Sequence, residues 1–292
     1  MFAKVSLPSI CLLFSLAVAR AQDVAAYVDI QTSSLPIILT APHGGTLKPS
    51  GIKDRTLGKT VTDSNTAQLT DLIAAALKEQ YGARPHVVKC LLHRSKVDCN
   101  RDLEEAAQGD PIAAATWRRF HGAAEQMRKH VLTQHGAGLL LDIHGHRHEE
   151  RRVELGYLIA GPRLNQSDEA LNGNRAIALD SSIRELDLRS PQSFTELLRG
   201  PQSLGALLEE RGFRSVPSPS RRGPGVAQYF SGSYTVTAHG SRDEGAISAI
   251  QVECPWDGVR DKPENQRRFA KALAEALGLY FKVHFGKNLG AN

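Results

Sequence analysis

Short apolar runs that end abruptly in polar residues are the main feature of the chain. Residues 35–41 (LPIILTA) lead into His43 within a Pro-His-Gly-Gly turn, residues 141–146 (LDIHGH) end in two histidines, and residues 246–252 (AISAIQV) lead into Glu253. Each run has the length and composition of a buried β-strand. Because open α/β sheets carry out chemistry at the carboxyl ends of their strands, we expect these polar residues to meet at one sheet edge.

Helical and strand-like patterns alternate along the rest of the chain. Apolar residues at helical spacing predict helices over 69–77, 117–131 and 263–281, and further apolar runs predict strands at 85–92 and 155–160. The alternation predicts an α/β fold with three layers, α/β/α, in which a mixed, mostly parallel sheet is covered by helices on both faces.

Two long stretches interrupt this alternation. Residues 160–174 and 216–232 are rich in Gly, Pro, Ser and Asn, and we expect both to be surface loops within one domain. Loops of this length often shape a substrate pocket.

The N-terminal residues have the pattern of a secretory signal peptide. Lys4 precedes an apolar stretch at 10–18, and Ala19-Arg20-Ala21 is a small-x-small cleavage site before Gln22. The apolar stretch is too short to span a membrane. We therefore expect residues 1–21 to be removed, the protein to be secreted (extracellular or periplasmic) without a membrane anchor, and residues 22–292 to form a single catalytic domain.

Charge and cysteine content narrow the function classes. The formal net charge is +5, but the basic residues are spread out and aromatic residues make up only 6% of the chain, so we expect no nucleic-acid partner. The positive balance suits a small anionic substrate.

In an oxidising compartment, Cys90, Cys99 and Cys254 would form one disulfide and one free thiol, although the sequence cannot choose the partners.

The strand-end residues have the chemistry of a hydrolytic zinc site. Two strand-end histidines and a strand-end carboxylate are the parts of such a site. Asp63 lies on the turn before the first predicted helix, where it is either a helix N-cap or a metal ligand. Asn100 and Arg101 place an amide beside a guanidinium, a pair that can hold a carboxylate at two points, and Asp98 could orient a metal-bound imidazole.

Taken together, these motifs resemble the N-formylglutamate amidohydrolase family, which is related to zinc carboxypeptidases and to aspartoacylase-type deacylases. The resemblance covers residues 35–256 and depends on the order of five blocks. These are Pro42-His43-Gly44-Gly45, Asp63, Arg94-x-x-x-Asp98-x-Asn100-Arg101, Asp142-x-His144, and a His239-Gly240 segment that leads into Gln251-x-Glu253.

The resemblance implies a zinc carboxypeptidase-like fold, one bound zinc ion and a role for each matching residue. The zinc ligands would be His43, Asp63 and His144, and the carboxylates that support the metal-binding histidines would be Asp98 and Asp142. The substrate would be contacted by Asn100, Arg101, Arg94 and His239. The catalytic acid-base would be Glu253. Hydrolysis of an N-acyl amino acid by zinc-activated water, with Arg101 orienting the substrate carboxylate, is the reaction that this set implies.

Two departures from the family pattern leave alternatives open. The strand-end motif usually continues as Asp-x-His-Ser, whereas here His144 is followed by Gly145 and His146, so His146 competes as a ligand. Position 46 is Thr where carboxypeptidases have the Glu of His-x-x-Glu, so the third ligand must come from elsewhere. A secreted protein does not serve intracellular histidine breakdown, which leaves three hypotheses: an N-acyl amino acid hydrolase, a zinc exopeptidase or cell-wall peptide amidase, and an inactive binding protein.

Overall fold

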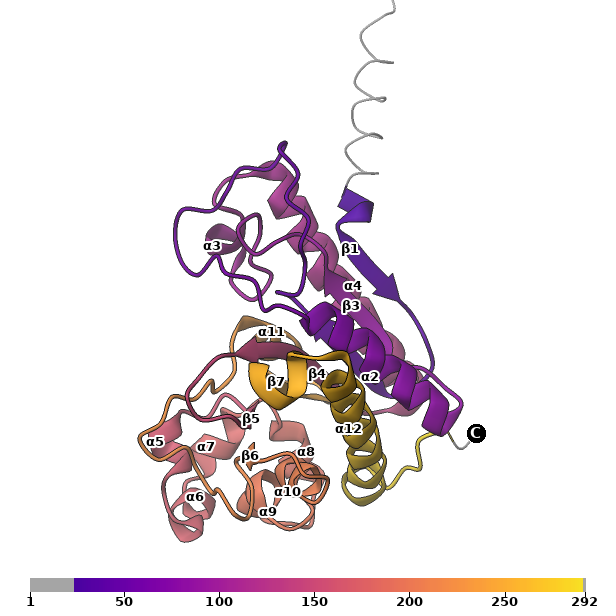
Figure 1. Cartoon of the computed structure of the whole chain (residues 1–292). Coiled ribbons are helices and arrows are strands. Elements are labelled where there is room, and N and C mark those ends of the chain that lie inside the picture. Colours follow the sequence, from indigo (N-terminus) through magenta and orange to yellow (C-terminus); the bar gives the residue numbers. More distant parts are fainter. Residues whose placement is uncertain (1–23, 291–292) are drawn as a thin grey trace, which may run out of the picture.

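A seven-stranded mixed sheet forms the centre of the structure, a computed structural model that describes residues 24–290 (Figure 1). Its order is β1-β3-β2-β4-β7-β5-β6. The strands are β1 Val28–Gln31, β2 Ile37–Ala41, β3 His86–Cys90, β4 Gly138–His146, β5 Val153–Gly156, β6 Ser215–Val216 and β7 Ile247–Pro255. Neighbours pair in parallel from β3 through β2 and β4 to β7 and between β5 and β6, whereas β1–β3 and β5–β7 are antiparallel.

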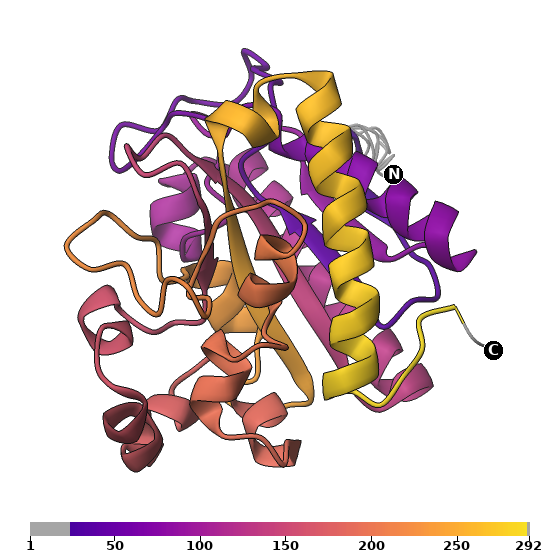
Figure 2. The same ribbon diagram turned by 60° about the horizontal axis from the view of Figure 1, so that its bottom comes forward.

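Three long helices cover the two faces of the sheet. Helices α2 (Thr66–Tyr81) and α12 (Pro263–His284) pack side by side on one face, and α4 (Pro111–His135) packs on the other. Figure 2 shows α12 lying along the sheet. This arrangement confirms the predicted three-layer α/β/α fold.

Side-chain alternation along the strands explains how the sheet builds two cores. Leu39 and Leu141 join the cluster that packs under α2 and α12. Their neighbours Ile38 and Leu140 point the opposite way and join the cluster under α4. Successive residues of a strand face opposite sides, so a strand that is apolar throughout is buried on both faces.

Local capping sets the ends of the long helices. Helix α4 begins after Asp110, whose carboxylate accepts hydrogen bonds from the backbone N–H groups of Ile112 and Ala113. Helices α2 and α4 both end at a glycine in the left-handed region, Gly82 (φ 72°) and Gly136 (φ 72°), which a residue with a side chain rarely adopts.

The remaining helices are short and lie in the connections between these elements. They are α3 Leu103–Ala107, α5 Gly161–Leu164, α6 Asp168–Gly173, α7 Arg175–Leu179, α8 Arg184–Arg189, α9 Phe194–Arg199, α10 Leu204–Glu209, α11 Tyr234–His239 and the turn η1 Trp256–Arg260.

Three sequence expectations need correction here. The stretch at 160–174 is not a loop: it contains α5 and α6, because Ser167 caps α6 and Leu164 and Leu171 are buried. The strand expected at 155–160 begins earlier, at Val153, where it pairs with β6. The loop expected at 216–232 begins one residue later, because Val216 belongs to β6, and residues 217–232 are irregular.

The described cysteines also differ from the expectation. Cys90, Cys99 and Cys254 are all free and buried, so the expected disulfide is not formed. Cys254 lies in the core under α12, whereas Cys90 and Cys99 lie in the core under α4, and this separation excludes Cys254 as a partner. The expected signal segment, residues 1–21, lies outside the described residues. In the described part of the chain, no helix is both long and apolar enough to cross a membrane.

Candidate metal centre

Parallel pairing of β2, β4 and β7 brings the strand-end residues of the three apolar runs together. In the β2–β4 register Thr40 is opposite Asp142, and in the β4–β7 register His144 is opposite Glu253. His43 follows β2 directly. The polar ends of three separate segments therefore meet at one sheet edge, as the sequence predicted.

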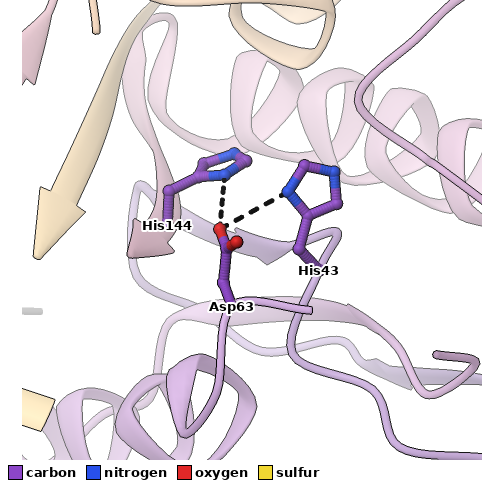
Figure 3. A group of neighbouring side chains, drawn as sticks. All are labelled: His43, Asp63 and His144. Carbon is purple, nitrogen blue, oxygen red and sulfur yellow. Dashed lines mark hydrogen bonds and ion pairs between the residues drawn. The ribbon is translucent and has the colours of Figure 1, made fainter. Parts of the chain in front are cut away.

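His43, Asp63 and His144 converge on one point (Figure 3). Asp63 Oδ2 lies 3.5 Å from His43 Nδ1 and 3.2 Å from His144 Nδ1. One ligand atom from each residue lies within 4.8 Å of the others, and both imidazoles are almost fully buried.

The protonation of both imidazoles is fixed by carboxylates behind them. His43 Nε2 donates to Asp98 Oδ1 over 2.6 Å, and His144 Nε2 donates to Asp142 Oδ2 over 2.8 Å. Because an ionised carboxylate only accepts hydrogen bonds, the Nε2 atoms carry the protons and the Nδ1 atoms of the neutral rings carry lone pairs. Two lone pairs thus point at the Asp63 carboxylate, and His43 Nδ1 is buried without a hydrogen-bond partner.

This donor set fits a metal ion. Imidazole nitrogen and carboxylate oxygen are ordinary zinc ligands, and a carboxylate on the far nitrogen is the usual support of a metal-binding histidine. Acceptors facing acceptors repel one another unless a cation lies between them. The competitor His146 is not part of this group.

The surrounding carboxylates also favour positive charge at the centre. Against its burial, the adjoining imidazoles His144 and His43 hold the pKa of Asp63 well below its ordinary value, so this carboxylate is ionised. Burial likewise opposes charge on His144, but Asp142 outweighs it and raises the pKa of His144 well above the ordinary value, so without a metal a proton takes the place between His144 Nδ1 and Asp63 that a metal cation would fill. Against its burial, His43 and Arg94 lower the pKa of Asp98.

The position of Asp63 resolves its two sequence interpretations. Helix α2 has Asn65 as its N-cap residue with no side-chain cap, so the Asp63 carboxylate does not cap the helix. Instead, Asp63 Oδ2 accepts the backbone N–H of Gly145 over 3.1 Å and faces the two imidazoles. The His43 turn is held against α2 because Gly44 has no side chain: a Cβ there would lie 2.3 Å from Ala67 N.

Gly145 lies where a side chain does not fit. A Cβ at this position would lie 2.2 Å from Cζ of Arg260. The Arg260 side chain is buried and donates to the carbonyls of Cys254 and His146, each over 3.0 Å, and to that of Ser64. No motif marked Arg260, because Ser64 and His146 are distant from it in sequence.

Glu253 lies beside the three converging residues. Its Oε1 accepts from Gln251 Nε2 over 2.9 Å and lies 3.9 Å from His144 Nδ1, while Oε2 is buried without a partner. Burial raises the pKa of Glu253 to about 8. A fixed, desolvated carboxyl with one unused oxygen is suited to proton transfer.

Asn100 and Arg101 line the cavity over the centre, which has a volume of about 700 Å³. Asn100 Oδ1 accepts the backbone N–H of Thr235 over 2.8 Å, which fixes the amide. Arg101 Nη1 donates to Ser233 Oγ over 2.8 Å and Nε to Glu105 over 3.1 Å.

Two residues that were expected to contact the substrate make other contacts in the structure. Arg94 lines the cavity, but its Nε donates to Asp98 over 2.9 Å and its Nη1 lies 3.7 Å from Asp63, so it supports the centre as well. His239 does not line the cavity: it is buried with Nε2 2.9 Å from His121 Nδ1. His239 is the last residue of α11, which precedes β7 and packs against α4.

A second group of histidines lies further along β4 and just beyond it. His146, His148 and Glu154 also have atoms within 4.8 Å of one another. However, His146 Nδ1 accepts the backbone N–H of His148 over 3.1 Å and its Nε2 donates to Arg152 O over 2.8 Å. Both nitrogens of His146 are therefore in use, and this second histidine cluster offers no comparable set of lone pairs.

Comparison with known proteins agrees with the fold expected from the motifs. No family model matches the chain, and no curated protein matches it in sequence. The crystal structure of N-formylglutamate amidohydrolase from Ralstonia eutropha is 12% identical, with a TM-score of 0.53 over 90% of this chain and 100% of that one. A gene product of Agrobacterium tumefaciens is 14% identical, with a TM-score of 0.50 over 88% and 95% of the two chains. This chain thus has the fold of a solved N-formylglutamate amidohydrolase.

Proposed function

We propose that the protein is a zinc-dependent hydrolase that cleaves a linear amide bond of an N-acyl amino acid. The observation that carries this proposal is the convergence of two imidazole lone pairs and one carboxylate at His43, Asp63 and His144. Three protein ligands of these types are the set found in catalytic zinc sites, which keep one position open for the reaction.

The residues around the centre divide the chemistry among them. When bound, zinc supplies Lewis-acid chemistry, which polarises a carbonyl and acidifies water. Glu253 accepts the proton of the attacking water through its unused oxygen and then delivers that proton to the leaving amine. Gln251 holds the other oxygen and so keeps the carboxyl in place.

Arg101 and Asn100 orient the substrate by its free carboxylate in this proposal. Both line the same cavity as Glu253, and the charge-assisted hydrogen bonds of a guanidinium suit a carboxylate. Arg94 lies deeper, where its ion pairs with Asp98 and Asp63 support the ligands.

Replacement of Arg101 by alanine tests this assignment. Arg101→Ala should raise KM about tenfold or more for a substrate with a free carboxylate and leave KM for the matching carboxamide nearly unchanged, because only the acid has an anion to pair with. Arg119→Ala, which removes an exposed arginine of α4, is the control. Equal losses on the acid and the amide would contradict the role.

A combined metal and substrate screen tests the proposed function itself. Purified protein should contain about one zinc per chain and hydrolyse formyl or acetyl amino acids. Faster hydrolysis of peptidyl substrates would favour the exopeptidase or peptide amidase alternative, and binding without hydrolysis would favour an inactive binding protein.

We also propose that the protein acts outside the cytoplasm. The support is the sequence pattern of residues 1–21, and N-terminal sequencing of the exported protein should begin at Gln22. A mature protein that begins at Met1 would contradict export by this signal.

A further inference from the structure

More cationic side chains line the cavity than are paired with a carboxylate. Five Lys or Arg side chains and two carboxylates line it, and both carboxylates, Asp63 and Glu253, belong to the centre. Arg94 is paired with Asp98 and Arg101 with Glu105. The remaining cations lie apart from these pairs.

Two of these cations share one aromatic ring. Cζ of Arg147 lies 4.3 Å from the ring centroid of Trp256, and Cζ of Arg260 lies 5.5 Å from the same centroid. Within residues 24–290, neither guanidinium forms an ion pair with a carboxylate. An aromatic face orients a cation without neutralising its charge.

A second ring gathers two more basic groups. Lys59 Nζ lies 4.9 Å from the ring centroid of Phe230, and the His148 ring lies 4.6 Å from it. Lys59 has no carboxylate partner in the described part of the chain.

The His148 ring is held in a fixed orientation. Its Nδ1 donates to Glu154 Oε1 over 3.1 Å, and Glu154 Oε2 accepts the backbone N–H of Phe230 over 2.8 Å. The buried Glu154 thus ties the ring to the loop that carries Phe230. His148 also lines the cavity, and because its Nδ1 donates to Glu154, Nε2 of the neutral ring carries a lone pair.

We propose that this basic wall (Lys59, Arg147 and Arg260) binds an anionic group on the acyl part of the substrate. The inference rests on the proposed function, in which Asn100 and Arg101 already take the carboxylate of the amino acid part. Lys59 and Arg147 are exposed and the wall has no carboxylate partner of its own among the described residues, so it is free to accept a second anion, which in this proposal belongs to the acyl part of the substrate. The substrate class is therefore an amide with an acidic acyl group.

Matched acyl groups test this class. The amino acid that the substrate screen selects is offered as its glutaryl derivative, which ends in a carboxylate, and as its glutaramoyl derivative, which ends in a carboxamide. The wild type should prefer the glutaryl compound at least tenfold in kcat/KM, and added salt should reduce this preference because it screens the charges. Arg147→Gln should reduce the preference about fivefold or more by raising KM for the glutaryl compound.

Arg151→Gln is the matched control, because Arg151 is exposed, pairs with Asp257 and does not line the cavity. Calorimetric binding of glutarate and of its monoamide, glutaramate, gives a readout without turnover: glutarate should bind more tightly, and Arg147→Gln should remove the difference. Equal kcat/KM for the two derivatives with active enzyme would overturn the acidic-acyl inference and leave the proposed function intact. Equal binding of glutarate and glutaramate would overturn it even if no substrate is hydrolysed.

Discussion

The metal centre and the second histidine cluster are close in sequence and differ in one decisive respect. His144 and His146 are two residues apart on β4, and each lies near another histidine and a carboxylate. In the metal centre, carboxylates accept hydrogen bonds from the Nε2–H groups, so the Nδ1 lone pairs of the neutral rings face inward. In the second cluster, a backbone N–H occupies the acceptor nitrogen of His146.

The charged groups behind the histidines also differ between the metal centre and the second histidine cluster. Asp98 and Asp142 stand behind the histidines of the metal centre. Behind the second cluster lie guanidinium groups: Arg152 Nε is 3.8 Å from Glu154, and Arg260 donates to the carbonyl of His146. Both nitrogens of His146 are in use, whereas each histidine of the metal centre keeps one nitrogen for a cation.

The largest expected effect comes from replacing one histidine of each group by alanine, in two separate variants. His144→Ala should lower zinc affinity more than 100-fold and abolish most activity, since it removes a ligand and unpairs Asp142. His146→Ala should keep close to one zinc per chain. Metal content after dialysis, measured by mass spectrometry, checks both, and greater zinc loss from His146→Ala would make His146 the ligand.

A smaller effect on metal, but a large one on rate, is expected at Glu253. Glu253→Gln should retain zinc and thermal stability while kcat falls by roughly 10²- to 10⁴-fold, the range for loss of general acid-base catalysis. Metal content and steady-state kinetics on the same preparation separate the two properties. A variant as fast as the parent would remove Glu253 from the mechanism.

The smallest effect should follow from changing the supporting carboxylates. Asp142→Asn should weaken zinc binding roughly 10- to 100-fold, because a carboxylate on the far nitrogen sets the tautomer and basicity of a ligand histidine. Glu154→Gln is the matched variant, since it is an equally buried carboxylate that accepts from His148. Competition with a zinc chelator measures both, and equal losses would mean that neither group is specific to the metal.

The sequence predicted the sheet edge well because strand ends in a parallel sheet must meet there. Apolar runs at 35–41, 141–146 and 246–252 became β2, β4 and β7, and the residues that follow or end them form the centre. Asp63 could not be assigned from sequence, because an N-cap and a ligand look alike until the helix start is known.

What the sequence could not show depends on contacts distant along the chain. Arg260 reaches Ser64, 196 residues away, and Glu154 joins Phe230, 76 residues away. Arg147 lines the cavity, which no sequence motif indicated. The sequence also does not show that the side chain of His239 turns toward His121.

The position of the metal tests the account most directly. X-ray diffraction data collected above and below the zinc absorption edge from crystals of the purified protein would locate zinc by its anomalous signal. The account predicts one peak bounded by His43 Nδ1, Asp63 and His144 Nδ1. A peak at His146, His148 and Glu154, or none in zinc-supplemented crystals, would contradict it.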